Sequence, residues 1–501
     1  MLRLNLLLCS FFLASTAIVS SAVTARGVAV SSNLARTAPL TLPQGALLLP
    51  TDIALHLDYY QLTMGQADFD VGNEAVITAN YYVRKVPQGA YLVSAGLEQV
   101  IHHILNFKLS DEALDWLETT GDFSAAYLAE LKNFRFDGSV YAVPEGTVVF
   151  PNAPIINVIG KSRDVQLFET YLLAVMNFQT LVATKSARIA QATQGRAFYD
   201  FGARRAHARD AGVLAARAAY IGGAAGTSLV SAAQFFAIPH VGTMAHKFVS
   251  ERPNELDAFR AYAKSFPHNT TLLLDTYDTI EGAKNACVVA HEMAAQGHQL
   301  RCVRLDSGDL VALSRQVRAL LDAEGLEEVK IIASNDLDEF RIAALLAADA
   351  PIDSFGVGTR LATAANFNPH TNAGGVSALA GVYKLVESDG VPMGKRSKDE
   401  PEKATLPARK QVYRLSDTDG NFYHDLIIPW HASPPAGATA LLEPIIVDGE
   451  LVYSFPTLPK IQEHTAKQLA KLPEQHKELD EAKPYSVKID PALQTANTPA
   501  P

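Results

Sequence analysis

The sequence is poor in cysteine and has no excess of positive charge. Its 501 residues include three cysteines, too few for a disulfide framework in a chain of this length, and no CxxC pair typical of a metal site occurs. Lys and Arg number 43 against 53 Asp and Glu, so the net charge is −10. We therefore expect no broad nucleic-acid-binding face, although a local basic pocket is compatible with this balance.

Beyond its N-terminus, the sequence also lacks an apolar run long enough to cross a membrane. Residues 1–26 carry Arg3 near the start, a largely apolar run over 4–19 and a small-residue end. This pattern predicts a secretory-type leader that is too short and too weakly flanked for a stable span. A translated segment that targets nothing is the alternative. Residues 27–46 are typical of a low-complexity tether, and we exclude both segments from the fold.

The whole chain is 48% hydrophobic and 19% charged, which is a globular composition, and its length favours two or three domains. Between about 270 and 365 one unit recurs: an apolar run, a polar turn and a stretch with helical periodicity. Asp275, Asp306 and Asp336 close three such runs at intervals of 31 and 30 residues, the length of one strand–helix unit. Continuous apolar strands alternating with helices predict a parallel sheet buried on both faces.

Ligands bind beyond the carboxyl ends of such strands, both in a closed (β/α) barrel and in an open doubly wound sheet, and periodicity alone does not distinguish the two. The flanking segments mix short strands with helices, which favours an α+β domain built from both chain ends. We expect residues 47–180 with 376–501 in that domain and 181–375 in an α/β barrel. The charge-rich segment 394–410 is typical of a flexible surface loop.

Several short patterns could bind an anion. Basic residues cluster between Lys185 and Arg209, and arginine suits a phosphorylated substrate because its planar fork holds two phosphate oxygens. A solvated helix face is an equally good interpretation of this cluster. The glycine-rich turns at 220–228 and 356–359 could present backbone N–H groups to a phosphate, or could be tight packing turns.

Two further pairs of residues could carry chemistry. His246 follows a strand-like stretch and could act as a base or take up a phosphoryl group, but His240 lies six residues earlier and the residues alone do not rank the two. Arg304 and Asp306 are two apart on one strand and therefore point the same way. They could form a salt bridge, or could hold a ligand carboxylate and a ribose hydroxyl or hydrated Mg²⁺.

Nine motifs occur along the chain in order: TDIALHLDYYQLTM (51–64), QLFETYLLAVMNFQTLVATKSARI (166–189), DFGARRAH (200–207), YIGGAAGTS (220–228), GTMAHKF (242–248), RLDSGDL (304–310), SND (334–336), GVGT (356–359) and GVYKLVE (381–387). Together they resemble the nicotinate phosphoribosyltransferase family over roughly residues 47–495. The resemblance implies an irregular (β/α) barrel with an open-faced α+β sandwich domain, in a homodimer whose protomers share their active sites.

The reaction that the resemblance implies joins nicotinate to phosphoribosyl pyrophosphate. It gives nicotinate mononucleotide and pyrophosphate with coupled hydrolysis of ATP, and it is the first step of NAD salvage from nicotinate. An enzyme that couples the transfer to ATP in this way is classed as a ligase. Departure of pyrophosphate leaves an oxocarbenium-like ribose, which calls for Mg²⁺ and cations on the leaving group rather than a strong protein nucleophile.

The resemblance also implies roles for individual residues. His246 falls on the histidine that takes the γ-phosphoryl of ATP, and Asp306 on a residue that holds the ribose and, indirectly, Mg²⁺. Five residues match positions that contact nicotinate or lie beside it: Phe201, Arg204, Thr243, Arg304 and, from the other protomer, Tyr60. Three residues match the phosphate end of the site: Asn335, Gly358 and Thr359.

The preference between acid and amide substrates follows from one position. Ser228 stands where the related nicotinamide-using enzymes carry an aspartate. At about 4 Å and an effective dielectric of about 20, an aspartate there would repel the nicotinate carboxylate by roughly 4 kcal/mol, so the neutral serine favours nicotinate. One departure from the family is Ala408, at a position where glycine is usual.

Two other classes compete with this interpretation. A metal-dependent hydrolase using Asp275, Asp306 and Asp336 would need histidines at the strand ends, and the sequence has no HxH motif. A secreted binding protein without activity is suggested by the leader but opposed by the intact His246, Arg304 and Asp306. The substrates predict a cytoplasmic protein, whereas the leader predicts export.

Overall fold

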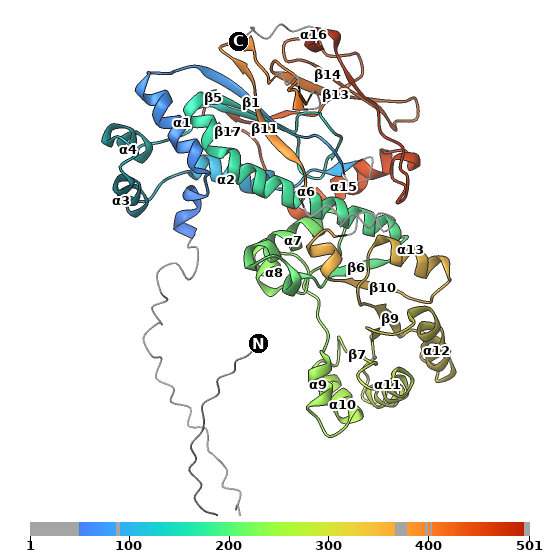
Figure 1. Cartoon of the computed structure of the whole chain (residues 1–501). Helices are drawn as coiled ribbons and strands as arrows, with labels where there is room; N and C mark the ends of the chain where they lie inside the picture. The colour runs from blue at the N-terminus through green and yellow to red at the C-terminus, as the bar shows by residue number, and fades with distance from the viewer. Residues whose placement is uncertain (1–49, 87–90, 366–377, 396–398, 401–402, 495–501) are drawn as a thin grey trace, which may run out of the picture. The chain divides into compact units, whose positions relative to one another are not determined.

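The computed structural model describes residues 50–86, 91–365, 378–395, 399–400 and 403–494, so the predicted leader and tether lie outside the described residues (Figure 1). Residues 51–501 form one unit, and the strands among its described residues make four sheets. Among the described residues, no helix combines the length and the apolar composition that a membrane crossing requires.

The largest sheet draws its seven strands from both ends of the chain. Its order is β12-β11-β1-β5-β3-β16-β17. The strands are β1 (Val76–Val83), β3 (Ser139–Ala142), β5 (Ile156–Lys161), β11 (Gly381–Ser388), β12 (Val391–Pro392), β16 (Glu443–Val447) and β17 (Glu450–Leu451). β1 pairs antiparallel with β5 on one side and with β11 on the other. The prediction that both chain ends build one α+β layer is therefore confirmed.

A four-stranded sheet in the order β15-β13-β14-β18 and a two-stranded sheet accompany it. Their strands are β13 (Lys410–Ser416), β14 (Phe422–Pro429), β15 (Thr439–Ala440), β18 (Val487–Ile489), β2 (Leu92–Val93) and β4 (Val148–Val149). The helices of this part are α1 (Tyr59–Asp70), α2 (Leu97–Asn106), α3 (Asp111–Thr120), α4 (Ala125–Lys132), α5 (Ser162–Val165), α15 (Leu458–Lys471) and α16 (Pro491–Gln494). Lys410 opens β13 and is buried, so the end of the expected surface loop belongs to the core.

The middle of the chain forms a five-stranded sheet in which every neighbouring pair is parallel. Its order is β6-β10-β9-β8-β7. The strands are β6 (Ala197–Asp200), β7 (Thr271–Leu273), β8 (Cys302–Leu305), β9 (Lys330–Ala333) and β10 (Ser354–Val357). Single bridges from Asp200 to Thr227 and from Thr227 to His240 continue the order past β6. The predicted parallel sheet is confirmed. Closure of this sheet into a barrel, with β7 joining the other end, stays a prediction.

Helices follow these strands, as the repeated unit predicts. They are α7 (Arg209–Ile221), α8 (Val230–Phe236), α9 (His246–Ser250), α10 (Glu255–Ser265), α11 (Thr279–Ala294), α12 (Leu310–Ala323), α13 (Glu339–Ala347) and α14 (Thr359–Ala362). Asp278, Asp309 and Asp338 directly precede α11, α12 and α13, and each carboxylate accepts from at least one backbone N–H of the first turn. These aspartates are N-caps, so each polar turn after a strand also starts the next helix.

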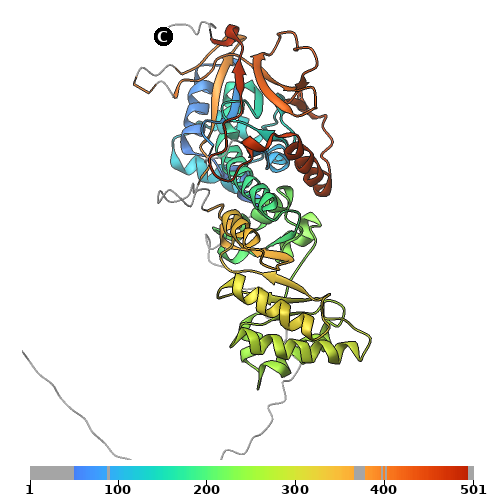
Figure 2. The same cartoon turned by 90° about the vertical axis from the view of Figure 1, so that its right-hand side faces the viewer.

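The long helix α6 (Glu169–Ala192) lies between the antiparallel sheets and the parallel sheet in both views (Figures 1 and 2). On one side the Thr184 hydroxyl accepts from the Val93 N–H of β2 at 2.9 Å. On the other side the Lys185 ammonium pairs with Glu339 of α13 at 2.6 Å, with both side chains fully buried. The domain limit expected at residue 180 falls inside this helix, and the domain limits stay predictions.

A second buried ion pair joins the two parts. Arg217 of α7 donates to both carboxylate oxygens of Glu145, at 2.8 and 2.7 Å, and to Glu98 of α2 at 2.8 Å. Burial alone would raise the pKa of Glu145, but the Arg217 charge and its hydrogen bonds outweigh burial and lower it. Because Arg217 and Glu145 are both buried, removing Arg217 would leave a buried carboxylate without its counter-charge, and removing Glu145 would leave Arg217 with only the partly exposed Glu98 as an anionic partner.

Candidate active site

A cavity of about 1000 Å³ opens where the strands of the parallel sheet end. Its walls come from the segments after β6, β8, β9 and β10 and from the chain that precedes α9. Nine of the ten residues expected in the site line it: Phe201, Arg204, Thr243, His246, Arg304, Asp306, Asn335, Gly358 and Thr359. They come together because the carboxyl ends of parallel strands meet at one edge.

Arg304 lies on the wall of this cavity with its guanidinium aimed at Thr243. Its Nη1 donates to the Thr243 hydroxyl and, at 3.4 Å, to the Met244 carbonyl. Its Nη2 lies 3.6 Å from Asp306 Oδ2. Burial lowers the pKa of Arg304 below its ordinary value, and the charges of Asp306 and Asp275 act against that effect. Arg304 is thus a partly desolvated cation, which strengthens its attraction for a carboxylate.

His246 begins α9 and projects into the same cavity. Its Nδ1 lies 3.2 Å from the Thr276 hydroxyl, and its Nε2 lies 3.7 Å from Asp306 Oδ2. The side chain is 46% exposed, so an incoming group can reach it. His240 does not line the cavity, which separates the two histidines that the residues alone left unranked. Thr276 was not expected in the site, although it directly follows Asp275 at a strand end.

Serine hydroxyl groups hold the carboxylates of Asp306 and Asp275. The Ser334 hydroxyl donates to Asp306 Oδ1, and the Ser307 hydroxyl donates to Asp275 Oδ2. The Oδ1 atom of Asp275 is buried and has no hydrogen-bond partner among the described residues. These carboxylate oxygens are the donor type that Mg²⁺ prefers, usually with water completing its shell. No group of three metal-ligating side chains occurs among the described residues.

The ring of Phe201 lies over a glycine that makes room for it. A Cβ atom added to Gly356 would meet the Phe201 ring at 2.4 Å. The turn that carries Phe201 is fixed by Asp200, whose carboxylate accepts from the Gly202 N–H and from the Thr227 hydroxyl, each at 2.8 Å. Burial raises the pKa of Asp200, and these two hydrogen bonds oppose that rise. The buried Asp200 carboxylate therefore fixes the turn that places the Phe201 ring at the cavity.

The basic cluster divides into two groups with different surroundings. Arg204, Arg205 and Arg209 line the cavity. Lys185 and Arg188 are buried and pair with Glu339, so the expectation that the cluster as a whole binds an anion is wrong for these two. Both residues belong to α6, which lies between the sheets. Cations on its buried face need a carboxylate partner because they are removed from water.

The residues expected to hold a phosphate and the residue expected to select acid over amide also line this cavity. Asn335 and Asp336 follow β9 with φ angles of 87° and 48°, a left-handed conformation that Asn and Asp adopt more readily than most other side chains. Ser228 is exposed and lines the same cavity as Arg304 and Phe201, and its N–H donates to the Asp200 carbonyl at 2.9 Å.

Tyr60 is the one expected site residue that does not line this cavity. It lies on α1 with 44% of its surface exposed, beside the exposed Tyr59 and Met64. Partial burial, together with Glu169, raises the pKa of its phenol to about 12. Its assigned role therefore stays a prediction that depends on a second protomer.

The chain is similar to known proteins over most of its length. Three family descriptions match: the nicotinate phosphoribosyltransferase (NAPRTase) N-terminal domain over residues 55–177, the NAPRTase family over 196–421 and the C-terminal domain over 431–497. A nicotinate phosphoribosyltransferase of Mycobacterium tuberculosis is 41% identical over 85% of this chain and 89% of that protein. One of Bacillus subtilis is 37% identical over 87% and 93%. The crystal structure of human nicotinic acid phosphoribosyltransferase superposes with a TM-score of 0.77 at 27% identity, covering 87% and 98% of the two chains.

Proposed function

The chain belongs to the nicotinate phosphoribosyltransferase family, and we propose on that basis that it transfers the phosphoribosyl group of phosphoribosyl pyrophosphate to nicotinate. The products are nicotinate mononucleotide and pyrophosphate, and ATP hydrolysis is coupled to the transfer, as in a ligase. The reaction is the first step of NAD salvage from nicotinate. The observation that carries the proposal is the single cavity that Arg304, Phe201, His246 and Asp306 line together.

In this proposal nicotinate binds between Arg304 and Phe201. The Arg304 guanidinium holds the carboxylate with help from the Thr243 hydroxyl, to which it is already hydrogen-bonded. The Phe201 ring stacks on one face of the pyridine, and Arg204 lies near the junction with the sugar. Ser228 is neutral, so nothing at that position repels the carboxylate.

The transfer itself breaks the bond between ribose C1 and the pyrophosphate oxygen and forms one between C1 and the pyridine nitrogen. Asp306 holds the ribose, and the backbone and side chains of Asn335, Gly358 and Thr359 hold the phosphate of the sugar. Asp306 would also orient Mg²⁺ through water, and the ion, when bound, neutralises charge on the departing pyrophosphate. The protein contributes chiefly position and electrostatic stabilisation of an oxocarbenium-like centre.

ATP coupling runs through His246. The imidazole Nε2 attacks the γ-phosphorus, a P–N bond forms and ADP leaves with the electrons of the broken P–O bond. Thr276 holds Nδ1, which orients the ring. Later hydrolysis of the phosphohistidine returns the free imidazole and releases inorganic phosphate. The exposure of His246 supports this role, because an imidazole must reach the nucleotide to accept its phosphoryl group.

The second face of nicotinate is covered by Tyr60 of the other protomer in a homodimer. Its exposure on α1 supports this arrangement. Tyr60→Ala and His246→Ala chains, each inactive alone, should regain part of the activity when mixed, because one of the two sites in a heterodimer keeps both residues. Failure of verified heterodimers to recover activity would overturn the shared site.

The reaction is tested by giving the purified protein nicotinate, nicotinamide or quinolinate, each with and without ATP, and identifying the mononucleotide formed. Nicotinate mononucleotide, in higher yield with ATP, is the expected product. His246→Ala should abolish both the ATP stimulation and the acid-labile phosphorylation. Label from γ-³²P-ATP that persists in this variant would refute the assignment of His246. The substrates suggest a cytoplasmic protein, and cell fractionation with an assay of any exported form tests that expectation.

A further inference from the structure

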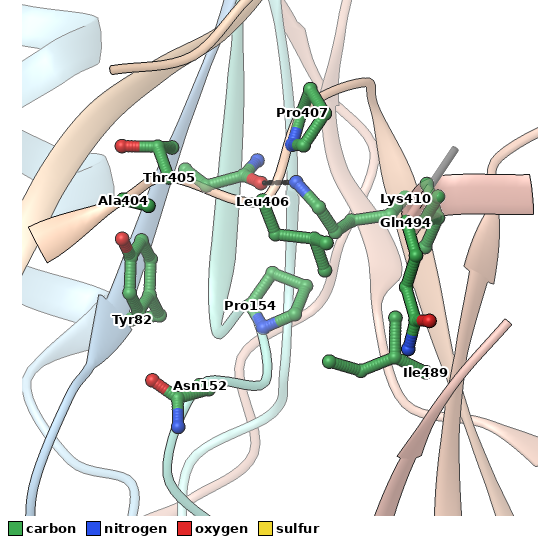
Figure 3. Close-up of a pocket in the computed structure, with 12 residues that line it drawn as sticks. Tyr82, Asn152, Pro154, Ala404, Thr405, Leu406, Pro407, Lys410, Ile489 and Gln494 are labelled. Atoms are coloured by element: carbon green, nitrogen blue, oxygen red, sulfur yellow. Dashed lines mark hydrogen bonds between the residues drawn. The ribbon is translucent and has the colours of Figure 1, made fainter. Parts of the chain in front are cut away.

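A second cavity, of about 310 Å³, lies between the seven-stranded and four-stranded sheets and shares no lining residue with the candidate active site (Figure 3). Asn80 and Tyr82 of β1 form one wall. Ile489, at the end of β18, and Gln494, at the end of α16, lie on the other side, and Lys410 at the start of β13 closes one end. Nothing in the proposed reaction uses this space.

Lys410 is the charged group of the cavity, and its surroundings satisfy it incompletely. The side chain is 3% exposed. Its Nζ donates to Asn80 Oδ1 at 2.7 Å and to the Ala408 carbonyl at 2.8 Å (Figure 3 shows the first of these bonds). An ammonium has three N–H groups, so the third meets no acceptor among the described residues. A ligand that accepts this hydrogen bond would complete the set.

Asn80 is oriented for this contact by a chain of hydrogen bonds. Its Nδ2 donates to Asn157 Oδ1 on β5, and Asn157 Nδ2 donates to the Lys410 carbonyl at 3.0 Å. The two amides therefore each have one donor and one acceptor engaged, and Asn80 must present its oxygen, not its nitrogen, to the Lys410 amine. This link between the two sheets holds the amine at the end of the cavity.

The surroundings of the Lys410 amine make its protonation sensitive to the charge of a ligand in the cavity. Burial lowers the pKa of Lys410 to about 7, and the negative charge of Glu387 on β11 opposes this. Glu387 also accepts from the Arg409 N–H at 3.0 Å, and Tyr82 is the other titratable residue that lines the cavity. Near neutral pH the amine thus carries a proton only part of the time. An anion beside it would favour the protonated form.

The chemistry of the walls limits the class of ligand. Apart from Lys410 every lining residue is neutral, and Pro154, Leu406 and Ile489 supply apolar surface. One ammonium in a neutral cavity matches one negative charge, whereas a phosphate dianion would call for further cations. The volume is at the small end of the range for small-molecule sites. We propose that this cavity is a second ligand site, which binds a small monocarboxylate with a compact apolar body through the Lys410 ammonium.

Cyclohexanecarboxylate is a suitable probe because it has one carboxylate and a compact apolar ring. Its binding is measured by calorimetry on an Arg304→Leu chain, which removes the carboxylate partner in the active-site cavity. One molecule per chain should bind. Lys410→Met in this background should weaken binding by about ten- to a hundredfold, the loss of a charged hydrogen bond. To the chain that keeps Lys410, the uncharged cyclohexanecarboxamide should bind more weakly than the acid. To the Lys410→Met variant, the amide and the acid should bind about equally well.

The pH dependence separates this role from a purely structural one. The probe stays ionised between pH 6 and 9, so its affinity should fall about tenfold per pH unit above pH 7, as the amine loses its proton. Leu406→Trp, which fills the cavity while Lys410 is kept, should also abolish binding, and it serves if Lys410→Met does not fold. Unchanged affinity in either folded variant, absent binding at millimolar probe, or affinity independent of pH would overturn the proposal. None of these outcomes depends on whether the chain transfers phosphoribosyl groups.

Discussion

The Nδ1 atom of His246 lies 3.2 Å from the hydroxyl oxygen of Thr276, the residue that directly follows Asp275. This contact leaves Nε2 directed toward Asp306, 3.7 Å away. A histidine that accepts a phosphoryl group on Nε2 carries its proton on Nδ1, and the Thr276 hydroxyl can accept that N–H and so hold the orientation of the ring.

Thr276→Val should therefore slow phosphorylation of His246 while nicotinate binding is kept. Loss of one hydrogen bond worth about 1 kcal/mol predicts a rate about fivefold lower. Single-turnover labelling with γ-³²P-ATP measures this rate, and Thr276→Ser, which restores the hydroxyl, serves as the matched control. Equal labelling rates in the valine and wild-type proteins would contradict the role of Thr276.

Ser228→Asp should shift preference from nicotinate toward nicotinamide. A carboxylate on the cavity wall would repel that of nicotinate, by up to about a thousandfold in affinity. The ratio of kcat/KM for the two substrates measures the shift. Ser228→Asn has a similar size without the charge, so its ratio should stay closer to that of the wild type. Similar ratios for the Asp and Asn variants would refute the charge argument.

Gly356→Ala should raise KM for nicotinate strongly and should lower thermal stability only slightly. The added Cβ would meet the Phe201 ring at 2.4 Å, so the ring must leave its place beside the cavity. Steady-state kinetics and a thermal melt together test this. A further Phe201→Leu substitution removes the clash, so it should restore stability without restoring KM. Unchanged KM in Gly356→Ala would show that the position of the ring does not matter for binding.

Ala408→Gly should stabilise the protein. Ala408 has a φ of 69°, a left-handed conformation that costs a residue with a Cβ roughly 1 kcal/mol and costs glycine little. The turn is kept by the Ala408 N–H, which donates to the Val386 carbonyl at 2.7 Å. Urea unfolding should show a gain of about 1 kcal/mol. Ala404→Gly, at a position without positive φ, should instead give no gain, and equal effects of the two changes would contradict the strain argument.

Glu145→Gln should destabilise the chain by about 3 kcal/mol, because Arg217 stays buried without its main counter-charge. Adding Arg217→Met should recover most of the loss.

The pKa of Glu145 is lowered in the folded state, so its stabilising effect is present above the ordinary glutamate pKa of about 4.3 and is lost as pH falls through the folded value. Between pH 7 and pH 3 the free energy of unfolding should therefore fall less steeply with pH in the double variant than in the wild-type protein. Curves of equal slope would contradict this.

The sequence predicted the parallel sheet because its strands are short, apolar and closed by polar turns. Asp306 and Asn335 could be assigned to one edge on that basis alone. Thr276 and Ser334 could not, since small hydroxyl residues follow many strands and only three-dimensional proximity to His246 and Asp306 distinguishes them. Membership of the nicotinate phosphoribosyltransferase family, inferred from nine motifs, is confirmed.

The basic cluster shows where sequence reasoning failed. Lys185 and Arg188 lie one helical turn apart, a spacing that also suits a solvated basic face of a helix. Their burial depends on Glu339, about 150 residues later, and no local pattern reveals such a partner. Lys410 is a similar case, because its charge-rich flank is typical of a solvated loop whereas its β-strand packs inside the sandwich.

The helix α6 has a mechanical consequence. Its hydroxyl and ammonium groups are bonded to the layers on both sides, and the pair between Arg217 and Glu145 crosses the same seam. Bending the chain there would separate buried charges from their partners, so a hinge motion between the two parts would carry a large free-energy cost. Movement that opens the cavity is then expected in the short segments that line it, such as the one joining Val241 to His246.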